Sequence, residues 1–126
     1  GASEGIGERI AATLVDQGYT VVGTSRRAKP LKAITPRRLN MTPLDVDEDV
    51  SVEALYSSLK ALDFKPDAII LNAGFGVSGS LEESSTHIAK AQFETNFLAC
   101  IAWYIILCPC SEKPTGVSLL SAQSQA

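Results

Sequence analysis

The chain has 126 residues, 45% of them hydrophobic and 20% charged, a composition typical of a globular protein with one core. Its 14 acidic residues outnumber the 11 Lys and Arg, and the net charge of −3 offers no cationic field for a nucleic acid. The longest apolar run, residues 97–108, is shorter than the roughly 20 residues that a membrane-spanning helix needs. We therefore expect no nucleic-acid partner and no membrane span.

The three cysteines lie between residues 100 and 110, too few and too close together for a disulfide framework. Cys108 and Cys110 lack the two-residue gap of a metal knuckle, so we expect inert thiols in a reducing, cytoplasmic compartment. The chain begins with Gly1 instead of Met and carries no targeting sequence. We interpret residues 1–126 as a single partial domain, a fragment of a longer protein.

The first half of the chain alternates helix-like and strand-like patterns. Apolar residues recur at helical spacing after Gly5, and Gly18 is a typical helix stop. Residues 19–25 are rich in β-branched side chains and predict a buried strand, followed by a variable loop to about residue 38 with room for a further helix. Residues 39–44 predict a second strand.

The second half repeats the alternation. Asp47 or Ser51 could cap a helix that runs through residue 62. The continuous apolar run 68–71 is typical of a strand covered on both faces in a parallel sheet. Thr86 could cap a long helix to residue 108, before a last strand over 117–120. The alternation predicts an α/β fold with a doubly wound parallel sheet, whose first strand would precede Gly1.

The opening sequence has glycines spaced Gly-x-x-x-Gly-x-Gly at the start of the first helix. A side chain at Gly5 or Gly7 would obstruct a phosphate group there, while the free N–H groups and the helix dipole favour an anion. Glycine-rich helix starts also occur for packing reasons, so this turn alone leaves a nucleotide site and a packing role equally open.

Further motifs along the chain give the glycine turn a context. GASEGIG resembles the glycine motif of the short-chain dehydrogenase/reductases, although that family's usual leading Thr is not present. Residues 44–46 resemble the family's acidic adenine-contacting site, and residues 71–74 resemble its Asn-Ala-Gly signature. The resemblance covers essentially the whole chain and implies an incomplete Rossmann-like fold that binds NAD(P).

The resemblance assigns cofactor-binding roles to specific residues. The pyrophosphate would lie on the turn, the adenine at the end of the second sequence strand, and the ribose side near the Asn-Ala-Gly signature. The pyrophosphate residues are Gly1, Ser3, Gly5, Ile6 and Gly7, and the adenine residues are Asp45 and Val46. The residues on the ribose side are Asn72, Ala73 and Gly74. Taken singly, Asp45 could merely cap the next helix and Asn72 could be a turn residue.

The choice between nucleotides depends on the end of the first strand. An acidic residue there accepts hydrogen bonds from the ribose hydroxyls and repels a 2′-phosphate, but this chain has Ser25. Arg26 and Arg27 follow, and guanidinium groups suit a phosphate, so the sequence favours NADP over NAD. A solvated basic pair is the alternative, and Glu4 stands where several NADP-using relatives carry a basic residue.

The resemblance implies hydride transfer between an alcohol and a carbonyl compound, with catalysis by a Ser, a Tyr and a Lys supported by an Asn. Ser121 is the candidate for orienting a small-molecule substrate, Ser124 is the alternative, and Asn96 is the supporting residue. A Tyr-x-x-x-Lys pattern occurs only at 56–60, before the Asn-Ala-Gly signature, where we read it as a pair on one helix face.

We therefore expect the parent protein to be an NADP-dependent oxidoreductase and this chain to be inactive by itself. The alternative is a non-catalytic NADP-sensing module. The run 97–108 of the predicted helix is too apolar to be exposed all round, which suggests a homo-oligomer that forms through residues 86–110.

Overall fold

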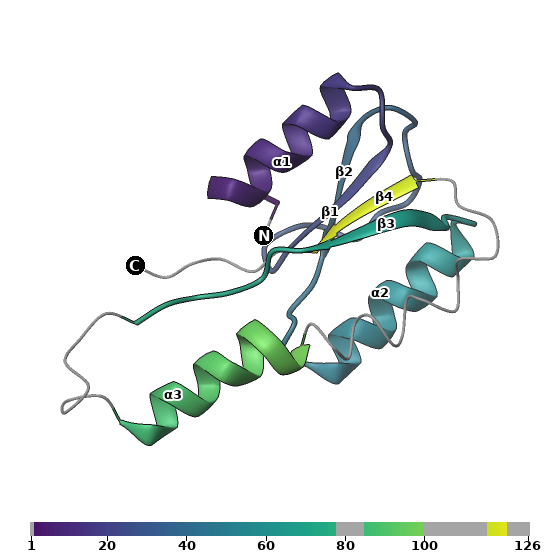
Figure 1. Cartoon of the computed structure of the whole chain (residues 1–126). Helices are drawn as coiled ribbons and strands as arrows, with labels where there is room; N and C mark the ends of the chain where they lie inside the picture. Colours follow the sequence, from purple (N-terminus) through teal and green to yellow (C-terminus); the bar gives the residue numbers. More distant parts are fainter. Residues whose placement is uncertain (1, 78–84, 100–115, 121–126) are drawn as a thin grey trace.

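The computed structural model describes residues 2–77 and 85–99 and the backbone of 116–120. A four-stranded parallel sheet carries helices on its two faces (Figure 1). The elements, in chain order, are α1 (Gly5–Asp16), β1 (Val21–Ser25), β2 (Leu39–Pro43), α2 (Asp49–Ala61), β3 (Pro66–Leu71), α3 (Thr86–Phe93), the π-helix η1 (Glu94–Leu98) and β4 (Gly116–Leu120). The predicted doubly wound α/β fold is confirmed.

The alternation of side chains along β1 explains why both faces are covered. Val21 is fully buried against Ala11 of α1, whereas Val22 belongs to a cluster on the other face with Leu55 and Leu59 of α2. Successive residues of a strand point to opposite faces, so two adjacent valines can hold one helix each. Figure 1 shows α1 and α2 on opposite sides of the sheet.

The strand order is β2-β1-β4-β3, so the last described strand lies inside the sheet. In the usual doubly wound order, the strand that leads into the glycine turn occupies this inner position. Here β4 pairs with β1 through Val21↔Val117 and with β3 through Leu71↔Leu120. The predicted strand over 68–71 lies within β3 at the edge of the sheet, where Ile69 and Ile70 pack against the clusters on the two faces while Ala68 and Leu71 are exposed.

The loop between β1 and β2 contains no helix over residues 26–38, although there is room for one. Pro30 and Pro36 each remove a backbone donor and so disfavour a helix. The buried Asn40 side chain organises the loop instead: Oδ1 accepts from the Thr35 N–H (2.7 Å), and Nδ2 donates to the carbonyls of Thr35 (3.0 Å) and Arg38 (3.0 Å). The Asn40 amide therefore supplies hydrogen bonds to the backbone of this loop in place of a helix.

Two helix starts differ from the expected caps. Ser85, not Thr86, caps α3, since its Oγ accepts a hydrogen bond from the Ile88 N–H (3.3 Å). At α2 neither Asp47 nor Ser51 is the N-cap, which is Glu48 without a side-chain hydrogen bond. The predicted helix over 86–108 changes to a π-helix at Glu94, and its residues 100–108 lie outside the described part. In the described residues, no helix has the length and apolar character to cross a membrane.

Candidate functional site

The glycine turn is attached to the carboxyl end of β1 by two hydrogen bonds. The Ala2 N–H donates to the Thr24 carbonyl (3.0 Å), and the Ser3 Oγ donates to the Ser25 Oγ (3.3 Å). In doubly wound sheets ligands bind beside the carboxyl ends of the strands. The predicted pyrophosphate residues therefore lie where this fold places its ligands.

The first turn of α1 begins in a form suited to an anion. Gly5 has a φ of +64°, a left-handed conformation that an L-residue with a side chain rarely adopts. Gly5 and Ile6 are exposed, Gly7 is buried, and the N-cap residue Glu4 makes no side-chain cap hydrogen bond. The first N–H groups of α1 thus lack a side-chain cap, and a phosphate group can accept their hydrogen bonds.

Gly23 is a site residue that the sequence reasoning did not identify. A Cβ at this position would lie 2.7 Å from the Ala2 Cβ, 2.7 Å from the Met41 Sδ and 2.9 Å from the Leu39 Cδ1. The absence of a side chain is what lets the glycine turn lie directly on β1. The available signal was a glycine inside a run of β-branched residues, which often marks the close approach of another backbone.

Ser25 connects the end of β1 with the basic pair that follows. Its Oγ accepts from the Arg27 N–H (3.4 Å), and its carbonyl accepts from the Leu44 N–H (3.2 Å). Arg26 and Arg27 are both exposed, next to the strand end that holds Ser3. Residues 25–32 contain four Lys and Arg and no Asp or Glu, so the start of the loop that follows β1 is cationic.

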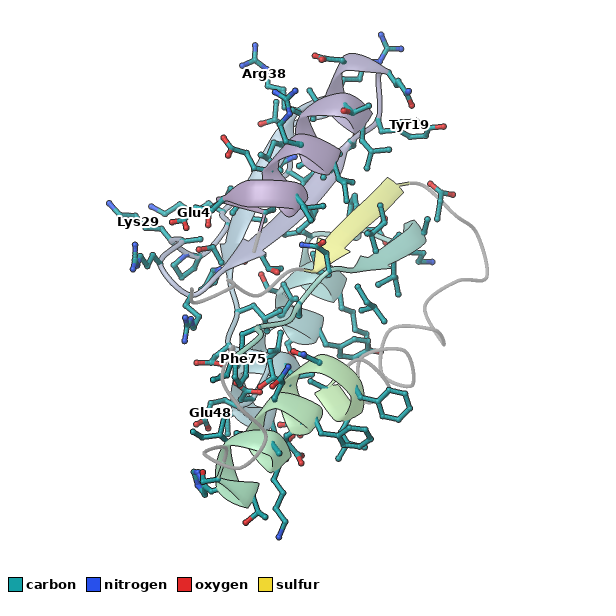
Figure 2. All side chains as sticks on the ribbon, turned by 60° about the vertical axis from the view of Figure 1, so that its left-hand side comes forward. Glu4, Tyr19, Lys29, Arg38, Glu48 and Phe75 are labelled. Carbon is teal, nitrogen blue, oxygen red and sulfur yellow. The ribbon has the colours of Figure 1, made fainter. Side chains whose placement is uncertain are left out.

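Opposite charge is also present at this site. Figure 2 shows Glu4 and Lys29 on the same side of the molecule, whereas Arg38 lies at the other end of the sheet. Glu4 belongs to the glycine turn itself and is exposed. The site therefore has the Glu4 carboxylate on the same side of the molecule as the cationic loop (Figure 2).

The loop after β2 carries the two residues predicted to contact adenine. The Asp45 N–H donates to the Ser51 Oγ (2.8 Å), and the Asp45 Oδ1 accepts from the Asp47 N–H (3.2 Å). Asp45 is half-buried, while the Val46 side chain is buried in the core cluster that includes α2. Val46 thus anchors the loop, and the part that it can offer to a ligand is its backbone.

Asn96 lies beside the loop after β3. Its Oδ1 accepts from the Phe75 N–H and its Nδ2 donates to the Phe75 carbonyl, both at 2.9 Å. Asn72, Ala73 and Gly74 are half-buried, and a Cβ on Gly74 would lie 3.1 Å from the Asn96 Oδ1. A glycine at 74 therefore gives the amide of Asn96 room to pair with the backbone.

Some predicted residues cannot be located. Gly1, Ser121 and Ser124 lie outside the described residues, although β4 ends at Leu120 in parallel with β1 and β3. Tyr56 packs against the core cluster on α2, and Lys60 is exposed. The structure thus brings the glycine turn to Ser25 and Asn96 to residues 74–75. The catalytic serine, Ser121 or its alternative Ser124, remains a prediction.

The chain is similar in sequence to short-chain dehydrogenases. A family model for short chain dehydrogenases matches residues 1–124. A probable short-chain type dehydrogenase/reductase of Helicobacter pylori is 33% identical over 99 residues, which are 79% of this chain and 36% of the relative. The chain thus spans about a third of this curated relative.

Solved structures agree with the family model. A short-chain dehydrogenase from Streptomyces avermitilis aligns with a TM-score of 0.75 and 26% identity, over 96% of this chain and 46% of that protein. An alcohol dehydrogenase from Thermococcus sibiricus, complexed with 5-hydroxy-NADP, gives a TM-score of 0.72 and 26% identity over 95% and 54%.

Proposed function

Because the chain belongs to the short-chain dehydrogenase/reductase family, we propose that it is the cofactor-binding part of an NADP-dependent oxidoreductase that interconverts an alcohol and a carbonyl compound. One observation carries this proposal: the Ser3 Oγ and the Ser25 Oγ lie 3.3 Å apart. This contact joins the glycine turn to the strand end from which Arg26 and Arg27 extend. A pyrophosphate and a 2′-phosphate of one nucleotide can therefore be bound side by side.

The binding residues follow from the elements that carry them. The turn and first helical residues, Gly1, Ser3, Gly5, Ile6 and Gly7, would hold the pyrophosphate. Asp45 and the Val46 backbone would contact the adenine, and residues 72–74 the ribose on the nicotinamide side. The uncapped first turn of α1 and its exposed Gly5 support this fit, since a side chain would cover the N–H groups.

NADP is proposed over NAD on the basis of charge at the end of β1. Ser25 offers no carboxylate to repel a phosphate, and two exposed guanidinium groups follow it. The bound 5-hydroxy-NADP of the Thermococcus sibiricus relative is compatible with this choice. Glu4 opposes it in part, and we expect the two arginines to outweigh one exposed carboxylate.

The bound cofactor would donate a hydride to a carbonyl carbon or accept one from an alcohol. In this proposal Ser121, or Ser124 in its place, orients the substrate oxygen, and Asn96 supports proton exchange. The Tyr-x-x-x-Lys pattern of these 126 residues lies on α2, with Tyr56 packed into the core. We therefore expect the chain by itself to bind nucleotide without turning over substrate.

The proposal is tested by measuring NADPH and NADH binding to the full-length protein with calorimetry. Arg26→Ala and Arg27→Ala should each weaken NADPH binding about 10-fold, because each removes a charge-assisted hydrogen bond worth about 1.5 kcal/mol, and should leave NADH binding unchanged. Arg38→Ala, an exposed arginine at the opposite end of the sheet, is the matched control. Absence of binding by either nucleotide would refute the proposed function.

Self-association through residues 86–110 is part of the same proposal. In the described residues of this segment, Phe93 is 56% exposed and Phe97 is 51% exposed, and their ring centroids are 5.0 Å apart. An exposed aromatic pair gains free energy when a second copy covers it. A monomeric mass in light scattering over a wide concentration range would contradict this.

A cytoplasmic location is the remaining part of the proposal, and cell fractionation tests it.

A further inference from the structure

Thr95 is a buried residue that makes a partly buried contact not used by the proposed function. It is 6% exposed within η1, and its Oγ1 donates a hydrogen bond to the Asp47 Oδ1 over 2.7 Å. The two residues are 48 positions apart in the sequence. The contact therefore ties the helical segment of residues 86–99 to the loop between β2 and α2.

Asp47 belongs to the loop that carries the proposed adenine contacts. Its backbone N–H donates to the Asp45 Oδ1 (3.2 Å), and the Asp45 N–H donates to the Ser51 Oγ (2.8 Å). Thr95 thus holds the carboxylate of the residue whose amide orients the Asp45 side chain. A hydrogen bond to a charged carboxylate is stronger than one between neutral groups.

The neighbouring residue holds a second loop. Asn96 binds both backbone polar groups of Phe75 at 2.9 Å, just after the Asn-Ala-Gly segment. Figure 2 labels Phe75 and Glu48, which mark the two loops, on the same side of the molecule beside the helical segment. Both Thr95 and Asn96 lie in the π-helix, a widened turn that is frequent at functional sites. Two adjacent side chains of one helical turn therefore hold two loops proposed to contact different parts of one cofactor.

We propose that Thr95 is a positioning residue that, through Asp47, sets the loop of Asp45 and Val46 and so determines affinity for the adenosine half of the cofactor. This inference depends on the proposed function. Replacing Thr95 with valine keeps the shape of the side chain but removes the hydroxyl that donates to the carboxylate of Asp47, an exposed residue. The loop then loses the contact that fixes it against η1, whereas the contacts of Asn96 to Phe75 remain.

The test compares the two halves of the cofactor on the full-length protein. Adenosine 2′,5′-bisphosphate probes the adenosine half, and reduced nicotinamide mononucleotide probes the other half. Thr95→Val should weaken binding of the bisphosphate about 10-fold, the effect of losing one hydrogen bond to a charged group, and should leave the mononucleotide affinity unchanged. Thr95→Ser retains the hydroxyl and should restore binding of the bisphosphate to within about 2-fold of wild type.

Two further variants keep the outcome decisive. Asp47→Asn retains an acceptor oxygen but not the charge, and it should lower the affinity for the bisphosphate by less than Thr95→Val does. This variant tests the same hydrogen bond from the other side if Thr95→Val folds poorly. Thr13→Val is the matched control, because the Thr13 Oγ1 donates to the Arg9 carbonyl (2.9 Å) within α1. Equal bisphosphate affinity in wild type and Thr95→Val, or an equal loss of affinity for both probes, would overturn the role of Thr95 without affecting the proposed function. Wild-type protein that binds neither NADPH nor the bisphosphate would overturn the proposed function together with this inference.

Discussion

Replacing Gly23 with alanine would drive a methyl group into the contact between β1 and the glycine turn. The added Cβ would lie 2.7 Å from the Ala2 Cβ, a full ångström inside the roughly 3.7 Å at which two carbon atoms pack best. The Met41 Sδ and the Leu39 Cδ1 are ends of flexible side chains and can rotate away. The Ala2 Cβ is bound to the backbone, so the turn itself must move by about 1 Å.

Overpacking of this kind costs about 1–3 kcal/mol of unfolding free energy. The shift also strains the hydrogen bond from the Ala2 N–H to the Thr24 carbonyl and the contact of Ser3 with Ser25. Since urea unfolding of a small domain has a slope of about 1–3 kcal/mol per molar, the midpoint of Gly23→Ala should fall by about 1 M. NADPH affinity should fall as well, because the displaced turn is the proposed pyrophosphate site.

Gly76→Ala is the matched control, because a Cβ at Gly76 meets nothing within 4 Å and its backbone is outside the left-handed region. Its midpoint should stay unchanged or rise slightly, since alanine restricts the unfolded chain. In the Gly23→Ala background, Ala2→Gly removes the fixed half of the clash and should recover part of the lost stability. Equal midpoints for Gly23→Ala and Gly76→Ala would refute the reasoning from the Ala2 contact.

Three other substitutions test neighbouring features. Gly5→Ala has open space but a φ of +64°, so it should cost about 1–2 kcal/mol in urea unfolding, and an unchanged midpoint would show that the turn relaxes freely. Asn40→Ala removes the acceptor of the Thr35 N–H and the amide that donates to the carbonyls of Val21, Thr35 and Arg38, and should lower the free energy of unfolding by about 2–3 kcal/mol; a thermal midpoint equal to wild type would contradict this. Asn96→Ala should speed hydrogen exchange of the Phe75 amide by about 10-fold, and protection equal to wild type would contradict the role of Asn96 in holding Phe75.

The local elements were predictable because their signals are local. Gly5 and Gly18 bracket α1 in the sequence, and α1 spans Gly5–Asp16. The β-branched run gives β1 to within two residues, at Val21–Ser25. The predicted cap of α3, Thr86, is wrong by one position. Ser85 and Thr86 both carry a hydroxyl, and only the backbone geometry distinguishes them.

The long-range features had no comparable signal. The sequence predicts a strand over 117–120 but does not say which strands it pairs with, so the inner position of β4 was not foreseen. The hydrogen bond from Thr95 to Asp47 joins residues 48 positions apart and depends on how α3 and η1 lie against α2. The proposed cofactor residues of the turn were named from the resemblance of GASEGIG to a family motif, whereas the role of Gly23 comes from its missing side chain at a contact that only the fold creates.

The inner position of β4 determines which strand pairings connect the described sheet. Within the described part of the chain, β3 is bonded to the sheet through β4, and β1 reaches β3 only across β4. Both pairings join segments far apart in the sequence, and such non-local contacts form slowly because a long stretch of chain must first be closed into a loop. Breaking the pairings of β4 would therefore separate β3 from β1 and β2 and leave unpaired strand edges on both parts.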